Sequence, residues 1–140
     1  TSPSRVAPLP CLRMDTHGKH LLAEYHGCPA EALDDVKRVE TVLNEAAVAA
    51  GATVVQSAFH RFRPHGVSGV VILAESHLSV HTWPEAGYAA VDLYTCGAVD
   101  AQAAHALLAR ELRAARSDLM VVERGLLTRN GPSLRLKDGG

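Results

Sequence analysis

The segment Ser68–Glu85 reads SGVVILAESHLSVHTWPE and holds a dense set of reactive side chains. Four of the six residues from Ser76 to His81 are serine or histidine. Side chains of these types can perform three kinds of chemistry. A serine or cysteine paired with histidine can hydrolyse a substrate, histidines can bind a metal, and a serine can attack the carbonyl that precedes it in the chain.

The sequence favours the third kind. The GxSxG elbow of many serine hydrolases is absent, and a strand–loop–strand setting differs from the strand-to-helix turn of that elbow. His77 and His81 could hold a metal, but there is no HExxH helix, and the nearest acidic residue lies in a turn. A serine that accepts the acyl group from its own nitrogen can instead undergo elimination, which leaves a pyruvoyl group. That group acts as an electron sink without a bound cofactor.

Hydrophobic periodicity predicts the elements that position these residues. The predicted strands are Lys19–His26, Ala52–Phe62, Val67–Ala74, Leu78–Trp83, Tyr88–Cys96 and Leu119–Val122, and the predicted helices are Pro29–Ala50 and Asp100–Arg116. Because the strands are joined mainly by short links, the sheet should be antiparallel with both helices on one face. The fold class predicted is therefore α+β, a two-layer sandwich.

Two tight hairpins, with tips at Glu75–Ser76 and at Pro84–Gly87, predict the register of the central strands. The opposed pairs are then Val70 with His81, Ser68 with Trp83, His81 with Ala90, and Glu75 with Cys96. Side chains alternate between the two faces of a sheet, so one face would carry four reactive or aromatic groups: Ser68, His81, Trp83 and Cys96. Cys96 would lie beside the first tip.

Composition excludes several classes of protein. The chain has 140 residues with a net charge of −1, which suggests a single domain without a basic surface for nucleic acid. Its longest apolar run, Val70–Ala74, is far too short to span a membrane. Three widely spaced cysteines do not form a disulfide framework, so we expect a reducing, cytoplasmic setting. We interpret residues 1–16 as a flexible leader, 17–128 as the domain and 129–140 as a polar tail.

The chain resembles the bacterial and archaeal S-adenosylmethionine decarboxylase proenzyme family, which is pyruvoyl-dependent. The resemblance is carried by the quoted segment followed by GYAAVDLYTCG, and upstream by KHLLAEYHGC and GATVVQSAFHRF. It is strongest from Phe59 to Gly97 and extends from His20 to Arg124, about three-quarters of the chain.

The resemblance implies a role for each reactive side chain. The chain would break between Glu75 and Ser76, and Ser76 would become the pyruvoyl group that forms a Schiff base with the substrate. His81 would accept the proton during elimination, Ser68 would assist the acyl shift, and Cys96 would donate a proton in catalysis. The products of cleavage would be a beta chain, 1–75, and an alpha chain, 76–140.

The resemblance also implies the substrate and its contacts. Phe62 and Trp83 would flank the adenine and the sulfonium of S-adenosylmethionine, and Glu85 would hold the ribose hydroxyls. The reaction would release CO2 and S-adenosylmethioninamine, the aminopropyl donor for spermidine synthesis. Neither pyridoxal phosphate nor a metal is expected. Processed units would form a homodimer of two alpha and two beta chains, with the sheets face to face in four αββα layers.

Other interpretations remain open. The same electron sink could decarboxylate ornithine or arginine, and an unprocessed chain could serve as a non-catalytic partner subunit. Phe62 and Trp83 could be core residues, and Glu85 could be a solvated turn residue. The chain also departs from the family pattern, since His65 stands where a tyrosine is frequent, which affects substrate contacts more than processing.

Overall fold

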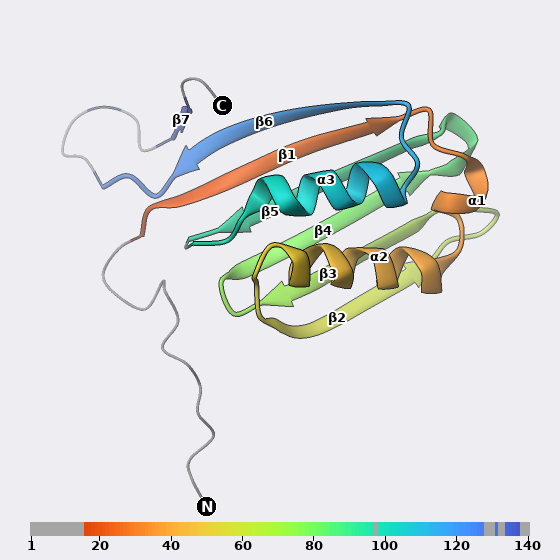
Figure 1. The fold of residues 1–140 in the computed structure, drawn as a ribbon, viewed down its shortest axis with the longest axis horizontal. Coiled ribbons are helices and arrows are strands. Elements are labelled where there is room, and N and C mark those ends of the chain that lie inside the picture. The colour runs from red at the N-terminus through yellow and green to blue at the C-terminus, as the bar shows by residue number, and fades with distance from the viewer. Residues whose placement is uncertain (1–15, 97, 128–130, 132–133, 138–140) are drawn as a thin grey trace, which may run out of the picture.

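The computed structural model describes residues 16–96, 98–127, 131 and 134–137, which form one antiparallel sheet with helices on a single face (Figure 1). The strands are β1 Gly18–His26, β2 Val54–Arg61, β3 Val67–Leu73, β4 Ser76–Trp83, β5 Tyr88–Thr95, β6 Arg116–Arg124 and β7 Arg135–Leu136. Their order in the sheet is β2-β3-β4-β5-β1-β6-β7. The predicted α+β architecture, with both helical segments on one face, is confirmed.

The first predicted helix is in fact two helices, α1 Ala30–Leu33 and α2 Val36–Ala49. Asp35 between them has an extended backbone, and its side chain accepts hydrogen bonds from the backbone N–H groups of Lys37 and Arg38. A side-chain carboxylate at this position satisfies N–H groups that have no partner within the helix, so it starts α2. The prediction of one continuous helix over Pro29–Ala50 was therefore wrong.

The second predicted helix is also shorter than expected. Helix α3 spans Ala101–Glu111 and does not reach Arg116. Arg113 adopts a left-handed backbone with φ of 57°, which ends the helix. The N–H of Ala115 then donates to the carbonyl of His26 at 2.8 Å, so the chain has already joined the sheet beside β1. Strand β6 is longer than predicted for this reason.

The core lies between the sheet and the helices. Helix α2 packs over β2, β3 and β4, and α3 packs over β1 and against α2 (Figure 1). The fully buried side chains include Tyr25, Leu33, Leu43, Leu78, Val80, Leu108 and Leu112. The opposite face of the sheet, here called the open face, exposes large apolar side chains of three different strands: Leu22, Ile72 and Met120. Its apolar groups have no covering layer within the described residues.

The register of the second hairpin was predicted correctly, and that of the first was not. His81 pairs with Ala90 as predicted, and Pro84–Ala86 form a 3-10 turn, η1, before β5. In the first hairpin the turn is Ala74–Glu75, so Ser68 pairs with His81 and not with Trp83. Because the pairing moved by two residues, each side chain kept its predicted face.

Two features lie at the ends of the described chain. Thr16 donates its hydroxyl to the carbonyl of Gly125 at 2.6 Å. Within the segment predicted as a polar tail, β7 pairs with β6 through Leu136 opposite Val122. Residues 1–15, which include Cys11 and most of the predicted leader, lie outside the described residues. Among the described residues, no helix has the length and apolar character needed to cross a membrane.

Candidate active site

The predicted cleavage bond joins the last residue of a turn to the first residue of β4. Ser76 has a φ of 153°, a conformation that is unfavourable for residues with a side chain. Such backbone strain is concentrated at functional sites. The carbonyl oxygen of Glu75 lies 3.3 Å from Sγ of Cys96 and accepts a hydrogen bond from the N–H of Cys96 at 3.4 Å. A strained serine, the carbonyl before it and a sulfur are thus adjacent, as the predicted pairing of Glu75 with Cys96 required.

The side chain of Glu75 anchors this turn and is 7% exposed. One carboxylate oxygen accepts a hydrogen bond from the backbone N–H of Thr53 at 3.0 Å, and the other accepts from its hydroxyl at 3.4 Å. The carbonyl of Thr53 in turn accepts from Ala74 N–H at 2.9 Å. Sequence reasoning missed Thr53, because a threonine ahead of a strand carries no signal of a contact made 22 residues later.

Cys96 is disulfide-bonded in the structure, which the sequence did not predict. A sulfur in a disulfide has no proton to donate, so any role as a general acid requires the reduced thiol. Cys28, by contrast, is a free and buried cysteine whose pKa is raised by burial. We therefore regard Cys28 as part of the core.

A second group of predicted residues meets further along β4. Oγ of Ser68 lies 2.7 Å from Nδ1 of His81, and the two residues are directly opposite across the strands β3 and β4. The hydrogen bond orients the imidazole and leaves its other nitrogen available to exchange a proton. The ring of Trp83 follows on the same face, with its centroid 6.5 Å from that of His81.

A pocket of about 390 Å³ adjoins the Ser68–His81 pair. It is lined by Phe62, Pro64, His65, Gly66, Ser68, His81, Thr82, Trp83 and Glu85. Phe62 is 46% exposed and Trp83 is 43% exposed, so neither is a core residue. All three predicted substrate-binding residues, Phe62, Trp83 and Glu85, therefore line one pocket. Tyr88 stacks behind Trp83 with ring centroids 5.2 Å apart and supports that ring.

The two groups lie at opposite ends of β4. Ser76 and His81 are five positions apart on the strand, which corresponds to about 17 Å at ~3.3 Å per residue. Because this number is odd, the alternation of side chains along β4 directs Ser76 and His81 to opposite faces of the sheet. Within one chain, His81 and Ser68 thus do not reach Ser76, although the sequence had suggested that all of them act on one bond.

A polar network that the sequence did not predict lies on the open face, close to Ser76. The carboxylate of Asp92 accepts hydrogen bonds from the hydroxyl of Ser79 and from Nε2 of His20 at 2.6 Å. Arg124 donates to the other nitrogen of His20 at 3.1 Å, which leaves the proton of His20 on the side that faces Asp92. His20 thus presents a proton and not a lone pair, which disfavours a metal between these groups.

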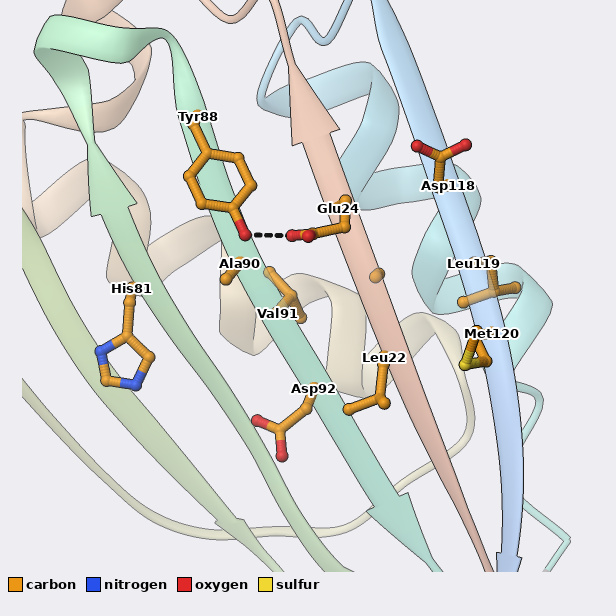
Figure 2. Close-up of a pocket in the computed structure, with 11 residues that line it drawn as sticks. Leu22, Glu24, His81, Tyr88, Ala90, Val91, Asp92, Asp118, Leu119 and Met120 are labelled. Atoms are coloured by element: carbon orange, nitrogen blue, oxygen red, sulfur yellow. Dashed lines mark hydrogen bonds between the residues drawn. The ribbon is translucent and has the colours of Figure 1, made fainter. Parts of the chain in front are cut away.

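The middle of the open face is hollowed by a pocket of about 580 Å³ between β4, β5, β1 and β6 (Figure 2). Apolar side chains such as Leu22 and Met120 line one part of it, and His81 lies at its edge. Tyr88 donates its hydroxyl to Glu24 across this pocket, and that hydrogen bond raises the pKa of Tyr88 to about 12 (Figure 2). An open sheet face of this kind has room for a further layer.

Fold and side chains together define a class of protein. It is a two-layer α+β sandwich in which a strained serine, a cysteine and a serine–histidine pair lie along one strand and its neighbours. The profile of the S-adenosylmethionine decarboxylase family matches residues 19–125. The chain belongs to the S-adenosylmethionine decarboxylase family.

Several known proteins are similar to this chain. The S-adenosylmethionine decarboxylase proenzyme of Thermotoga maritima is 51% identical over 113 residues, which cover 80% of this chain and 87% of that protein. The proenzyme of Carboxydothermus hydrogenoformans is 49% identical over 81% of this chain and 91% of its own length. The crystal structure of the Aquifex aeolicus adenosylmethionine decarboxylase superposes with a TM-score of 0.74 at 40% identity, over 84% of this chain and 98% of that one.

A more distant structure shares the fold alone. The Trypanosoma brucei AdoMetDC monomer matches with a TM-score of 0.57 at 14% identity, over 74% of this chain and 45% of that one. The match therefore supports the two-layer architecture and carries no information on individual residues of the site.

Proposed function

We propose that this chain is a self-processing decarboxylase that converts S-adenosylmethionine to S-adenosylmethioninamine and CO2. The observation that carries the proposal is the geometry at Glu75–Ser76, where a strained serine follows a carbonyl that lies 3.3 Å from Cys96. The names of the relatives support the same substrate. A cytoplasmic setting remains a prediction.

Processing takes three steps. The hydroxyl of Ser76 attacks the carbonyl carbon of Glu75, and the acyl group moves from nitrogen to oxygen, so the peptide becomes an ester. A base then removes the α-proton of Ser76, and Glu75 leaves as a carboxylate. Water finally replaces the nitrogen of residue 76, which departs as ammonia and leaves the pyruvoyl carbonyl. Relief of strain at Ser76 favours the first step, because the shift breaks the peptide bond to Glu75 and thereby removes the strained backbone torsion φ of Ser76.

When formed, the pyruvoyl group would supply an electrophilic carbonyl that stabilises the electron pair left by CO2. Residues of the chain would donate the proton and bind the substrate. Reduced Cys96 would return a proton to the α-carbon of the substrate. Trp83 and Phe62 would contact the adenine and the sulfonium, since aromatic faces attract cations, and Glu85 would accept hydrogen bonds from the ribose hydroxyls.

The separation of the two groups along β4 points to a homodimer with composite sites. A two-fold axis through the open face would place the Glu75–Ser76 turn and Cys96 of one copy over Ser68 and His81 of a second copy, so that the peptide bond of the turn, at the very end of β4, comes within reach of that histidine. Face-to-face packing of two sheets would also cover the exposed apolar side chains of the open face. The proposed assembly has four αββα layers, with two alpha and two beta chains.

A mixed-dimer experiment tests this arrangement. The variants Ser76→Ala and His81→Ala should each remain a single chain when expressed alone. When the two are co-expressed, the His81→Ala chain receives an intact histidine from the other copy, and it should be cleaved. Random pairing should yield about a quarter of the wild-type number of processed sites. A complete lack of cleavage in the co-expressed sample would contradict the composite site.

Substrate and chemistry are tested on the wild-type protein in the presence of a thiol reductant. Mass spectrometry should detect a pyruvoyl-terminated fragment that begins at residue 76, and CO2 should be released from S-adenosylmethionine. Release from ornithine or arginine alone would favour an amino-acid decarboxylase. The exposed rings of Phe62 and Trp83 argue for a substrate with a flat base. An intact chain without turnover would instead identify a non-catalytic partner.

A further inference from the structure

The rim of the substrate pocket holds a histidine, His65, that the proposed mechanism does not use and that contacts Glu85. Nε2 of His65 lies 3.0 Å from Oε1 of Glu85, and both side chains are half-exposed, at 38% and 51%. The two residues come from different parts of the chain, because His65 lies in the loop between β2 and β3 whereas Glu85 lies in η1. Any charge on His65 therefore acts directly on the residue that is proposed to hold the ribose.

The loop that carries His65 is firmly anchored. Phe62 N–H donates to the carbonyl of Gly66 at 2.7 Å and closes the loop. Asp34 accepts from Gly66 N–H and from the Arg61 guanidinium, each at 2.8 Å. The Gly66 N–H, more than the Arg61 guanidinium, holds the pKa of Asp34 below its usual range. The position of His65 is thus fixed by the backbone on both sides.

The segment of Glu85 is anchored as well. Pro84 is buried, and the N–H of Gly87 donates to its carbonyl at 3.2 Å. The His65–Glu85 contact therefore joins two segments at the mouth of the pocket, and the backbone of each segment is held by hydrogen bonds.

Protonation of His65 changes the net charge of the pocket rim, which depends on the charged groups around it. Glu85 faces it from η1, Asp34 and Arg61 lie on the side of α1 and β2, and His81 lines the same pocket from β4. Arg63 precedes Pro64 in the same loop. Arg61 and Asp34 form an ion pair at 2.8 Å and offset each other. With Arg63 included, these groups sum to zero when His65 is neutral and to one positive charge when it is protonated, so protonation of His65 makes the rim more positive by one charge.

We infer that His65 sets the charge of the substrate pocket, so that a cationic sulfonium nucleoside binds best when His65 is neutral. The inference rests on the proposed function. Neutral His65 still donates Nε2–H to Glu85 and orients that carboxylate toward a vicinal diol. Histidine is the side chain that changes its charge near neutral pH. For a separation of about 4 Å in a water-like dielectric, one added positive charge weakens the binding of a cation roughly fivefold.

The test compares wild type with His65→Tyr, because a tyrosine hydroxyl can donate to Glu85 without ever carrying a positive charge. KM and kcat for S-adenosylmethionine are measured at pH 6 and pH 8 on processed, reduced enzyme. The ratio of wild-type KM to variant KM should rise from pH 8 to pH 6 by up to about fivefold, the value for complete protonation of His65, while the ratio of kcat values stays constant. The ratio removes pH effects that both enzymes share, such as the titration of the substrate amine.

A matched control lies elsewhere in the molecule. Nε2 of His17 lies 3.3 Å from Oε1 of Glu123, and the His17 side chain is also 38% exposed. The variant His17→Gln should keep the wild-type dependence of KM on pH. His65→Gln provides a second test variant, and its KM ratio should change with pH in the same way as that of His65→Tyr. An equal KM ratio at both pH values for both His65 variants would overturn the inference.

Binding measurements separate the charge effect from the proposed function. The unprocessed Ser76→Ala chain is titrated with S-adenosylmethionine and with 5′-methylthioadenosine, a neutral thioether of similar shape. Only the cation should lose affinity through protonation of His65 between pH 8 and pH 6, so His65→Tyr in this background should remove that part of its pH dependence, up to about fivefold. The same pH dependence for the neutral thioether would refute the charge argument. Normal pH-dependent binding combined with no turnover by wild type would contradict the proposed function alone.

Discussion

Strain at Ser76 can be measured by comparing two variants that cannot be processed. Ser76→Ala keeps a β-carbon at a φ of 153°, whereas Ser76→Gly removes it. A residue held in a rarely populated backbone region costs about 1–3 kcal/mol, and glycine avoids that cost. Glycine loses about 0.4–1 kcal/mol through the greater freedom of the unfolded chain. The glycine variant should therefore be more stable than the alanine variant by about 1 kcal/mol.

The assay is urea unfolding of both intact chains at one protein concentration, after mass spectrometry has shown that neither is cleaved. Ser79 in the same strand supplies the matched control, because it is absent from the set of residues with positive φ. There the order should reverse, and Ser79→Gly should be less stable than Ser79→Ala by about 0.5–1 kcal/mol. If glycine destabilises both positions to the same extent, Ser76 is not strained, and strain does not assist the acyl shift.

Three further predictions concern the site and the sheet. Cys96→Ala should still cleave but lose about 100-fold or more in kcat, measured as CO2 release, because a general acid is missing; normal turnover would exclude Cys96 from that role. Burial raises the pKa of Asp92, but hydrogen bonds from Ser79, His20 and His77 outweigh it and hold the pKa below its usual range. The ionised carboxylate of Asp92 therefore stabilises the fold at pH values above the ordinary carboxyl pKa, and this stabilisation is lost as the pH falls through the pKa of the folded protein. The variant Asp92→Asn lacks this contribution. Its free energy of unfolding, measured by urea titration, should fall less between pH 7 and pH 3 than that of wild type. A β-carbon added at Gly69 would overlap the ring of Phe59, so Gly69→Ala should lower the free energy of unfolding by about 1–3 kcal/mol, and an unchanged urea midpoint would show that the ring moves freely.

The sequence predicted the sheet better than the helices, for physical reasons. Alternation of side chains has a period of two residues, so an error of two residues in a hairpin leaves every face unchanged, as it did for Ser68 and His81. Helix ends depend on single residues. The carboxylate of Asp35 and the left-handed backbone of Arg113 interrupt patterns whose apolar spacing continues past them. No periodicity marks such positions in advance.

For the site, the sequence identified the residue types and one face, but not the distances along it. These site residues lie together because β4, which carries His81 and Trp83, runs past Ser68 near the start of β3 and continues into η1, which carries Glu85. Ser76 was assigned to the same site because the resemblance gave it a role together with His81 and Ser68, and because the register placed Cys96 of the shared face beside the Glu75–Ser76 turn. Alternation of side chains gives the face on which a residue lies but not its distance along the strand, and the five positions between Ser76 and His81 are enough to separate them. The contacts of Glu75 with Thr53 and of His65 with Glu85 depend on tertiary structure, so they left no pattern in the sequence.

The order of the strands explains how the chain could be cut near its middle and remain folded. Cleavage before Ser76 would leave β1, β2 and β3 in the first piece and β4 to β7 in the second. In the sheet, however, β1 lies between β5 and β6, and β4 lies between β3 and β5. The two pieces therefore interleave, and three separate rows of backbone hydrogen bonds join them, at β3–β4, β5–β1 and β1–β6. The break removes only one turn, while the side chain of Glu75, held by Thr53, keeps the new carboxyl end in place. The pieces should consequently stay together in native buffer with a reductant and separate only in denaturant; their separation on native size-exclusion chromatography would show that the turn, and not the strand pairing, holds the sheet together.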